Sequence, residues 1–289
     1  MDLIWPGEFQ ITSPPVVARG VVVVGSSISD GARVDAPKGT VRAFDARTGE
    51  ALWGFNPVTR GATDFPDNWP SGDAARRTGH ANVWAPMSAD EARGLIFLPT
   101  SSPSPDFFGG LRAGDNRYAN SVVALKAGTG EVAWSFQTVH HDVWDYDVPA
   151  QPSLITLKRG GRDTDAVVQV TKTGFVFVLD RDTGQPLFDV VEKPVPQGGA
   201  LGEFLSPTQP FPVAPPPLVP QKLDPDDAWG LTPWDRNVCR EKIANARSEG
   251  LFTPPSEQGT IMFPFSGGGA NWGGAAYDPA LQTLYINTS

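Results

Sequence analysis

Phe44-Asp45-Ala46-Arg47-Thr48-Gly49-Glu50-Ala51-Leu52-Trp53-Gly54-Phe55 decides the fold, because this stretch recurs twice further along the chain. The second copy runs from Leu125 to Phe136, and a more diverged third copy runs from Leu179 to Phe188. Each copy predicts a strand, a tight turn and a second strand that ends in an aromatic residue. The Asp-x-x-Thr-Gly segment supplies a side-chain acceptor and a glycine that can take positive φ. The sequence therefore predicts a series of antiparallel hairpins.

A second repeated unit is offset from the first. Trp84 and Trp272 each stand six residues before an aspartate, Asp90 and Asp278, and an apolar strand follows in the same register. Two interleaved hairpin signatures are expected if every repeat is a four-stranded antiparallel blade. The predicted fold is therefore an all-β propeller, with strands near residues 41–45, 51–55, 95–99, 121–126, 131–136, 167–170, 175–180 and 283–287. A short helix is predicted near 236–249.

The spacing of the repeats is uneven, which requires long insertions at about 56–82 and 192–258 in a single domain of residues 1–289. The hairpins amount to roughly three and a half to four blades, and the sequence ends directly after a strand. A propeller closes only when its last blade meets its first, since open blades expose edges and apolar faces. We therefore expect an incomplete propeller.

Composition narrows the function. The net charge of −9 argues against nucleic acid as a partner, because phosphate binding needs a basic surface. No stretch reaches 18 apolar residues, so no transmembrane segment is predicted, and the N-terminus lacks the features of a signal peptide. A single cysteine, Cys239, excludes an internal disulfide. The 31 glycines and 29 prolines lie between apolar runs, which is typical of an all-β protein with many turns.

The densest cluster of reactive groups is His140-His141-Asp142-Val143-Trp144-Asp145-Tyr146-Asp147. On a strand, His141 and Asp145 would share a face, but a loop is an equal alternative because two prolines follow. An isolated His-His-Asp is most often a solvated acidic loop. A zinc site is a poor alternative, since no further His or Cys pair offers a fourth ligand.

Two kinds of tryptophan are expected. Trp53 and Trp134 lie inside the repeat, and we predict that each packs one blade against the next. Trp84 and Trp272 lie outside it. Lys172, in the turn Thr171-Lys172-Thr173-Gly174, carries little information by itself.

Four segments in order resemble the membrane-bound glucose dehydrogenases that use pyrroloquinoline quinone (PQQ), and the similarity runs through nearly all of the chain. The segments are Thr138–Pro152, Lys172–Arg181, Glu192–Gly198 and Phe252–Thr260. The wider family includes quinate, alcohol and methanol dehydrogenases. The resemblance implies an eight-bladed propeller with PQQ over its axis, of which this chain would supply about half.

The resemblance also assigns roles to particular residues. Asp145 matches the catalytic base, and it is the expected metal ligand. Lys172 matches a lysine at the quinone carbonyls, and Trp84 matches an aromatic residue lying against the PQQ ring. Asp30 matches a polar residue near the cofactor, and Trp272 resembles a cofactor-proximal tryptophan. The neighbours Asp142 and Asp147 receive no role.

These residue types suit the chemistry. PQQ accepts a hydride from the substrate carbon, so a carboxylate must take the hydroxyl proton. Negative charge grows on the quinone oxygens, where Lys172 and a hard cation, Ca²⁺ or Mg²⁺, are stabilising. The loop 100–105 lacks the asparagine ligand of the alcohol-oxidising relatives, which favours the sugar branch. We expect the metal-binding carboxylate of the family to lie N-terminal to Met1.

The leading hypothesis is a periplasmic dehydrogenase for a sugar or polyol, associated with the inner membrane in its full-length form, that passes electrons to a quinone or a cytochrome. Its missing propeller half is a further expected partner. The alternatives are a non-catalytic propeller scaffold and an inactive fragment of such an enzyme. A scaffold has no reason to hold Asp145, Lys172 and Trp84 together.

Overall fold

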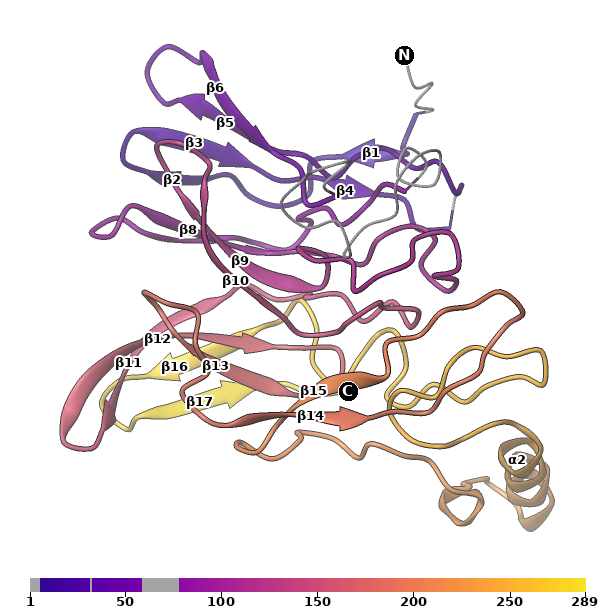
Figure 1. Cartoon of the computed structure of the whole chain (residues 1–289). Coiled ribbons are helices and arrows are strands. Elements are labelled where there is room, and N and C mark those ends of the chain that lie inside the picture. The colour runs from indigo at the N-terminus through magenta and orange to yellow at the C-terminus, as the bar shows by residue number, and fades with distance from the viewer. Residues whose placement is uncertain (1–5, 32, 59–77) are drawn as a thin grey trace.

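The computed structural model describes residues 6–31, 33–58 and 78–289. The described residues form mainly antiparallel sheets, which follow one another from the top to the bottom of Figure 1. The first sheet has the order β2-β3-β5-β6 (Val16–Ala18, Val21–Val24, Val41–Asp45, Ala51–Phe55). Between β3 and β5 the chain leaves this sheet, and β4 (Ser27–Ile28) pairs with β1 (Phe9–Gln10).

The second sheet is a simple four-stranded meander, β7-β8-β9-β10 (Ser88–Asp90, Leu95–Pro99, Ser121–Lys126, Val132–Gln137). The third sheet has three strands, β11-β12-β13 (Ser153–Arg159, Arg162–Val170, Val176–Asp180). Two hairpins follow along the chain, β14-β15 (Val190–Pro194, Thr208–Pro212) and β16-β17 (Ala275–Asp278, Thr283–Ile286). Consecutive antiparallel sheets of this kind are the blades of a β-propeller.

The helical part is small and lies at the lower right of Figure 1, away from the sheets. It consists of the 3₁₀ turn η1 (Pro225–Asp227) and the helix α2 (Pro233–Asn245). α2 begins at Pro233 because Thr232 and Asp235 form a capping box, with the Thr232 hydroxyl accepting from Asp235 N at 3.2 Å. The helix predicted at 236–249 therefore exists but starts and ends earlier.

The core lies between the sheets, and strand alternation builds it. In β8, Ile96 and Leu98 pack toward the first sheet, whereas Leu95 and Phe97 pack toward the third. All five residues of β8 are buried, because a blade in the middle of a stack is covered on both faces. The third sheet repeats the arrangement, with Val167 facing the second sheet and Val168 facing β16-β17.

Tryptophans join neighbouring blades, as predicted. The indole nitrogen of Trp53 donates to Ala127 O at 2.9 Å, and its ring lies against Gly130 in the turn of the next blade. Trp134 repeats this one blade later, donating to Arg181 O at 3.1 Å and packing against Gly184. The repeated tryptophans are therefore structural.

The turns also follow the sequence. Asp45 Oδ1 accepts from the backbone of Arg47 and Thr48 at 2.9 and 2.7 Å, and Gly49 has a φ of 74°. Asp180 makes the equivalent turn. Seven of the eight predicted strands agree within one residue, and β12 also forms, although it begins at Arg162 rather than 167.

Several elements were not predicted. They are β1, β2, β3, β4, β7, β11, β14, β15 and β16. The insertion predicted at 192–258 contains the end of β14, all of β15, η1 and α2. Of the insertion predicted at 56–82, residues 59–77 lie outside the described residues.

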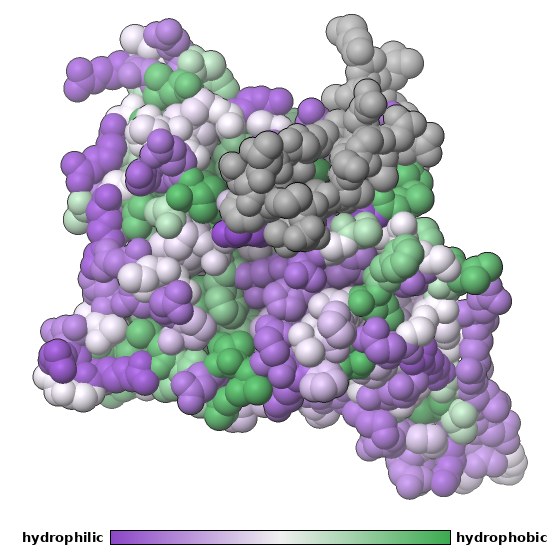
Figure 2. Space-filling view, in the orientation of Figure 1, coloured by the Kyte–Doolittle hydropathy of each residue, from purple (hydrophilic) through white to green (hydrophobic). Residues whose placement is uncertain are grey.

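The molecular surface is mixed. Figure 2 shows hydrophobic side chains in small groups between hydrophilic ones on this face. Within the described part of the chain, no helix has the length and apolar character that a membrane crossing requires.

Candidate functional site

Lys172 is the centre of a buried ion cluster. It stands in the tight turn between β12 and β13, which Gly174 completes with a φ of 77°. Its ammonium donates to the backbone oxygen of Asp145 at 2.8 Å and to Asp145 Oδ2 at 3.1 Å. It also reaches Asp147 Oδ2 at 3.3 Å. Only 6% of the Lys172 side chain is exposed, so these contacts hold it in one position.

Asp147 brings Trp84 into the same group. Its Oδ2 accepts from the indole nitrogen of Trp84 at 3.0 Å, and its Oδ1 accepts from Ser102 N at 2.5 Å. Trp84 precedes β7 in the second blade, whereas Lys172 belongs to the third. The carboxylate of Asp147 therefore joins residues from two blades.

The electrostatics of this cluster follow from two carboxylates sharing one ammonium. Burial, and then repulsion from Asp147, raise the pKa of Asp145 to about 9, although Lys172 opposes this. Burial lowers the pKa of Lys172, but the Asp147 and Asp145 carboxylates outweigh it and the net pKa is raised. One ammonium therefore balances only one of the two carboxylates, and ionising Asp145 as well would leave an excess negative charge in the cluster.

Hydrogen bonds to the Asp142 carboxylate fix the loop that carries Asp145. The fully buried Asp142 carboxylate accepts from Tyr146 N at 2.9 Å, Trp144 N at 3.0 Å and Asn120 Nδ2 at 3.0 Å, and also from the hydroxyl of Ser102. Burial raises the pKa of Asp142, although the bond from Ser102 opposes the shift.

Side chains of this loop alternate in direction. Trp144 and Tyr146 enter the core between the second and third blades, where Trp144 Nε1 donates to Thr253 O at 2.8 Å. Asp145 lies between them with a backbone φ of 57°, a conformation that residues other than glycine rarely adopt. The loop thus turns Asp145 away from the core and toward Lys172.

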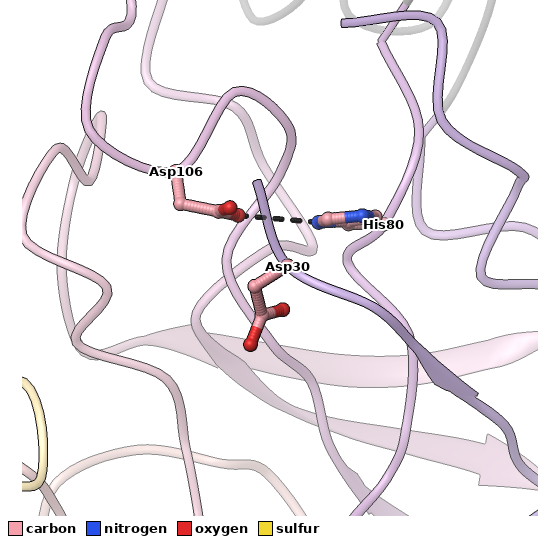
Figure 3. A group of neighbouring side chains, drawn as sticks. All are labelled: Asp30, His80 and Asp106. Atoms are coloured by element: carbon pink, nitrogen blue, oxygen red, sulfur yellow. Dashed lines mark hydrogen bonds and ion pairs between the residues drawn. The ribbon is translucent and has the colours of Figure 1, made fainter. Parts of the chain in front are cut away.

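A second group of titratable side chains lies near the first, since Asp30 interacts electrostatically with Asp147 and Lys172. Asp30, His80 and Asp106 bring one donor atom each within 4.8 Å of one another (Figure 3). His80 Nδ1 is 3.1 Å from Asp106 Oδ1, and Asp106 Oδ2 accepts from Gly31 N at 2.9 Å. Burial, followed by the Asp147 and Asp106 carboxylates, raises the pKa of Asp30 to about 6. The ionisation of Asp30 therefore depends on the charges of both the Lys172 cluster and the His80–Asp106 pair.

The structure brings together four of the five residues singled out from the sequence. Asp145 and Lys172 are in contact, Trp84 is linked to them through Asp147, and Asp30 is electrostatically coupled to Asp147 and Lys172. Trp272 lies on the loop whose Gly269 donates its backbone N–H to Lys172 O at 2.6 Å, but the Trp272 side chain is 74% exposed.

The structure decides between the two alternatives left open for residues 138–152 and adds three residues that received no role from the sequence. Residues 138–152 form a loop and not a strand, so His141 and Asp145 share no strand face. His141 instead bonds Gly114 O at 2.7 Å and Glu203 Oε1 at 3.4 Å. Asp147, which had no assigned role, is part of the cluster. His80 and Asp106 were also missed, and their only sequence signal was their residue type.

Comparison with known proteins places the chain in one family. The family model for the β-propeller domain of PQQ-dependent glucose, ethanol and alcohol dehydrogenases matches residues 1–289. The chain belongs to this family.

Individual relatives agree with this. The chain is 43% identical over 284 residues to a quinoprotein glucose dehydrogenase of Escherichia coli, a match that covers 98% of the chain and 35% of the relative. It is 42% identical over 285 residues to a quinate/shikimate dehydrogenase (quinone) of Acinetobacter baylyi, covering 97% of the chain and 34% of the relative. The chain thus spans about a third of the length of these curated relatives.

Solved structures show the same fold. The chain superposes on a europium-containing methanol dehydrogenase with a TM-score of 0.64 at 24% identity, covering 97% of this chain and 44% of that one. The quinohemoprotein alcohol dehydrogenase ADHIIG from Pseudomonas putida gives a TM-score of 0.66 at 24% identity, covering 97% and 37%. Both support the propeller.

Proposed function

We propose that this chain forms part of a quinoprotein dehydrogenase that oxidises a hydroxyl group of a sugar or polyol, with Asp145 as the general base. The observation that carries the proposal is the cluster in which one buried ammonium, Lys172, contacts Asp145 and Asp147 while Asp147 holds Trp84. A cation, a carboxylate and a flat aromatic ring are the groups that hydride transfer to a quinone needs.

Each residue has a distinct task in this proposal. PQQ, when bound, would supply the acceptor for the hydride that leaves the substrate carbon, which carries the two electrons of the oxidation. Lys172 places positive charge where the quinone oxygens would lie. Trp84 offers its ring face as a flat support, and Asp145 accepts the substrate's hydroxyl proton at its carboxylate. Asp30 and Trp272 are proposed to complete the cofactor site.

The donor set also fits a hard divalent cation. The carboxyl groups of Asp30, Asp106, Asp145 and Asp147 lie around the ammonium of Lys172 and the imidazole of His80, and their full ionisation would leave excess negative charge. Carboxylate oxygens are the ligands that Ca²⁺ and Mg²⁺ prefer. Because the pKa of Asp145 is about 9 without such a cation, the carboxyl is protonated at neutral pH. We propose that a cation near Asp145 keeps it ionised and ready to act as a base.

The substrate class and the setting are proposed from the relatives. Their names include glucose, quinate/shikimate and glycerol dehydrogenases, all acting on hydroxyl groups. A quinone is the proposed electron acceptor, as the name of the Acinetobacter enzyme states for that protein, with a cytochrome as the alternative. We propose a periplasmic location, and further propeller blades as a partner.

Reconstitution tests the proposal. The chain is mixed with PQQ and Ca²⁺ or Mg²⁺, binding is followed by absorbance, and dye reduction is measured with glucose, glycerol and quinate. Bound PQQ and substrate-dependent dye reduction that Asp145→Asn abolishes would support it. Binding without turnover would mean that the chain alone is an inactive part of such an enzyme. Absence of PQQ binding to both the chain and a form extended by further blades would refute the proposal.

A further inference from the structure

Asp147 differs from Asp145 in its surroundings, although the two residues share one loop and one ammonium. The Asp147 side chain is 8% exposed and that of Asp145 is 16% exposed. Asp147 uses both oxygens on protein donors: Oδ1 takes Ser102 N, and Oδ2 takes both the Trp84 indole and the Lys172 ammonium. Asp147 is therefore engaged with the protein rather than directed at a substrate.

We propose that Asp147 is a positioning residue that fixes the ring of Trp84 relative to the ammonium of Lys172. This inference rests on the proposed function, in which these two residues hold the cofactor. Trp84 and Lys172 come from different blades, so the fold alone sets their spacing only coarsely. A carboxylate bonded to both, and anchored by Ser102 N, sets the angle and distance of the ring against the cation.

The requirement for a carboxylate follows from the donor count. Asp147 receives three N–H groups on two oxygens. An asparagine in its place has one oxygen acceptor, and its amide N–H₂ would face one of these donors. With its N–H₂ toward Trp84 and Lys172, the asparagine releases both of them. With its N–H₂ toward Ser102 N, it loses that anchor and leaves the indole bonded to a neutral amide oxygen, so the Trp84 indole is affected in either orientation. A bond between a charged and a neutral group is stronger than a neutral bond, so the loss is larger than for an ordinary hydrogen bond.

The first test needs no cofactor. Indole N–H signals of the nine tryptophans are recorded by NMR, and the Trp84 signal is identified by its loss in Trp84→Phe. We expect Asp147→Asn to shift this signal and to speed its exchange with solvent at least tenfold. The matched control is Asp90→Asn, because Asp90 is also 8% exposed and ion-paired, but with Arg93 and Arg181, whereas the Trp84 indole bonds Asp147. An unchanged Trp84 signal in Asp147→Asn would overturn the inference.

The second test measures PQQ affinity by absorbance titration. Asp147→Asn should weaken PQQ binding about tenfold, which corresponds to about 1.4 kcal/mol. Trp84→Phe keeps an aromatic ring but removes the donor, and it should weaken binding by a similar factor. Because both changes break one interaction, the double variant should bind no worse than either single variant. Multiplicative losses would show that Asp147 acts independently of Trp84.

The two tests separate the inference from the proposed function. If the wild-type protein binds no PQQ, the proposed function fails, and the NMR comparison still decides whether Asp147 fixes the indole. If Asp147→Asn does not fold, Trp84→Phe carries the test, because it leaves the carboxylate in place. A Trp84→Phe variant with wild-type PQQ affinity would then refute the positioning role.

Discussion

The indole of Trp134 covers the turn glycine Gly184 so closely that a Cβ at residue 184 would come within 2.5 Å of the ring. Trp53 has the same relation to Gly130, where the distance would be 2.6 Å. At Gly49, in the turn of the first blade, an added Cβ would meet nothing within 4 Å. The three glycines share almost the same φ, between 72° and 74°.

This relation predicts unequal effects of one substitution. Alanine at any of the three turns costs about 1–2 kcal/mol because of the positive φ. At residues 130 and 184 it also displaces a packed indole, which adds about 1–3 kcal/mol. We expect Gly130→Ala and Gly184→Ala to unfold at lower urea concentration than Gly49→Ala. Equal midpoints for the three variants would contradict the docking.

Trp53 and Trp84 should separate stability from binding. Trp53→Ala removes an interblade contact, so the free energy of unfolding should fall by about 3 kcal/mol with PQQ affinity little changed. Trp84→Ala removes the proposed ring support, which should weaken PQQ binding about tenfold. Urea unfolding and PQQ titration of both variants check this. Equal losses of affinity would mean that the two rings have been assigned wrongly.

Asp145→Asn should remove the proposed proton acceptor and keep the fold. In the PQQ-loaded protein we expect turnover to fall by about 10²- to 10⁴-fold, the usual contribution of a general base. The measurement is dye reduction at saturating substrate, with PQQ affinity determined in parallel. A variant with near-normal turnover would show that another group takes the proton.

Asp142→Asn should act on stability instead. The buried carboxylate accepts from two backbone N–H groups, so an amide in its place leaves at least one buried donor unsatisfied. We expect the free energy of unfolding to fall by about 1–3 kcal/mol. Asp115→Asn is a suitable control in the same urea experiment, because Asp115 contributes its backbone oxygen to Gln137 and His141 rather than its carboxylate. Wild-type stability for Asp142→Asn would contradict this account.

The ion pairs of Asp90 predict a pH dependence. Partial burial raises the pKa of Asp90. Hydrogen bonds from the backbone N–H of Arg93 and from the side chains of Arg93 and Arg181 outweigh this effect, so the net pKa is lowered. A lowered pKa means that the stabilisation is present above the unfolded value, about 3.9, and is lost as the pH falls through the folded value. Wild type should exceed Asp90→Asn in stability at pH 6, and the difference should shrink below about pH 4. A constant difference would show that charge is not its source.

The sequence predicted those strands of the blades that are joined by a turn with a clear local signal. Asp45 and Gly49 specify their turn through side-chain acceptors and positive φ, and these signals need no tertiary information. β15 was missed because two of its five residues are prolines. Proline cannot donate a backbone hydrogen bond and is found in sheets mainly on edge strands. β14 was missed because four of its five residues are exposed, so no buried face marks it.

The site was predictable only in part, for a different reason. Asp145 and Lys172 were found through their resemblance to a family, and their contact follows from the fold. Asp147 has the same charge and the same loop as Asp145, so nothing local distinguishes the two. What separates them is the approach of Trp84 and Ser102 from another blade. His80 and Asp106 likewise meet only after folding.

The left-handed backbone conformation of Asp145 costs folding free energy, while its side chain is the proposed base. A glycine at this position would relieve about 1–2 kcal/mol of conformational cost and would also delete the proposed base. A thermostability screen without an activity readout would therefore tend to discard this carboxylate.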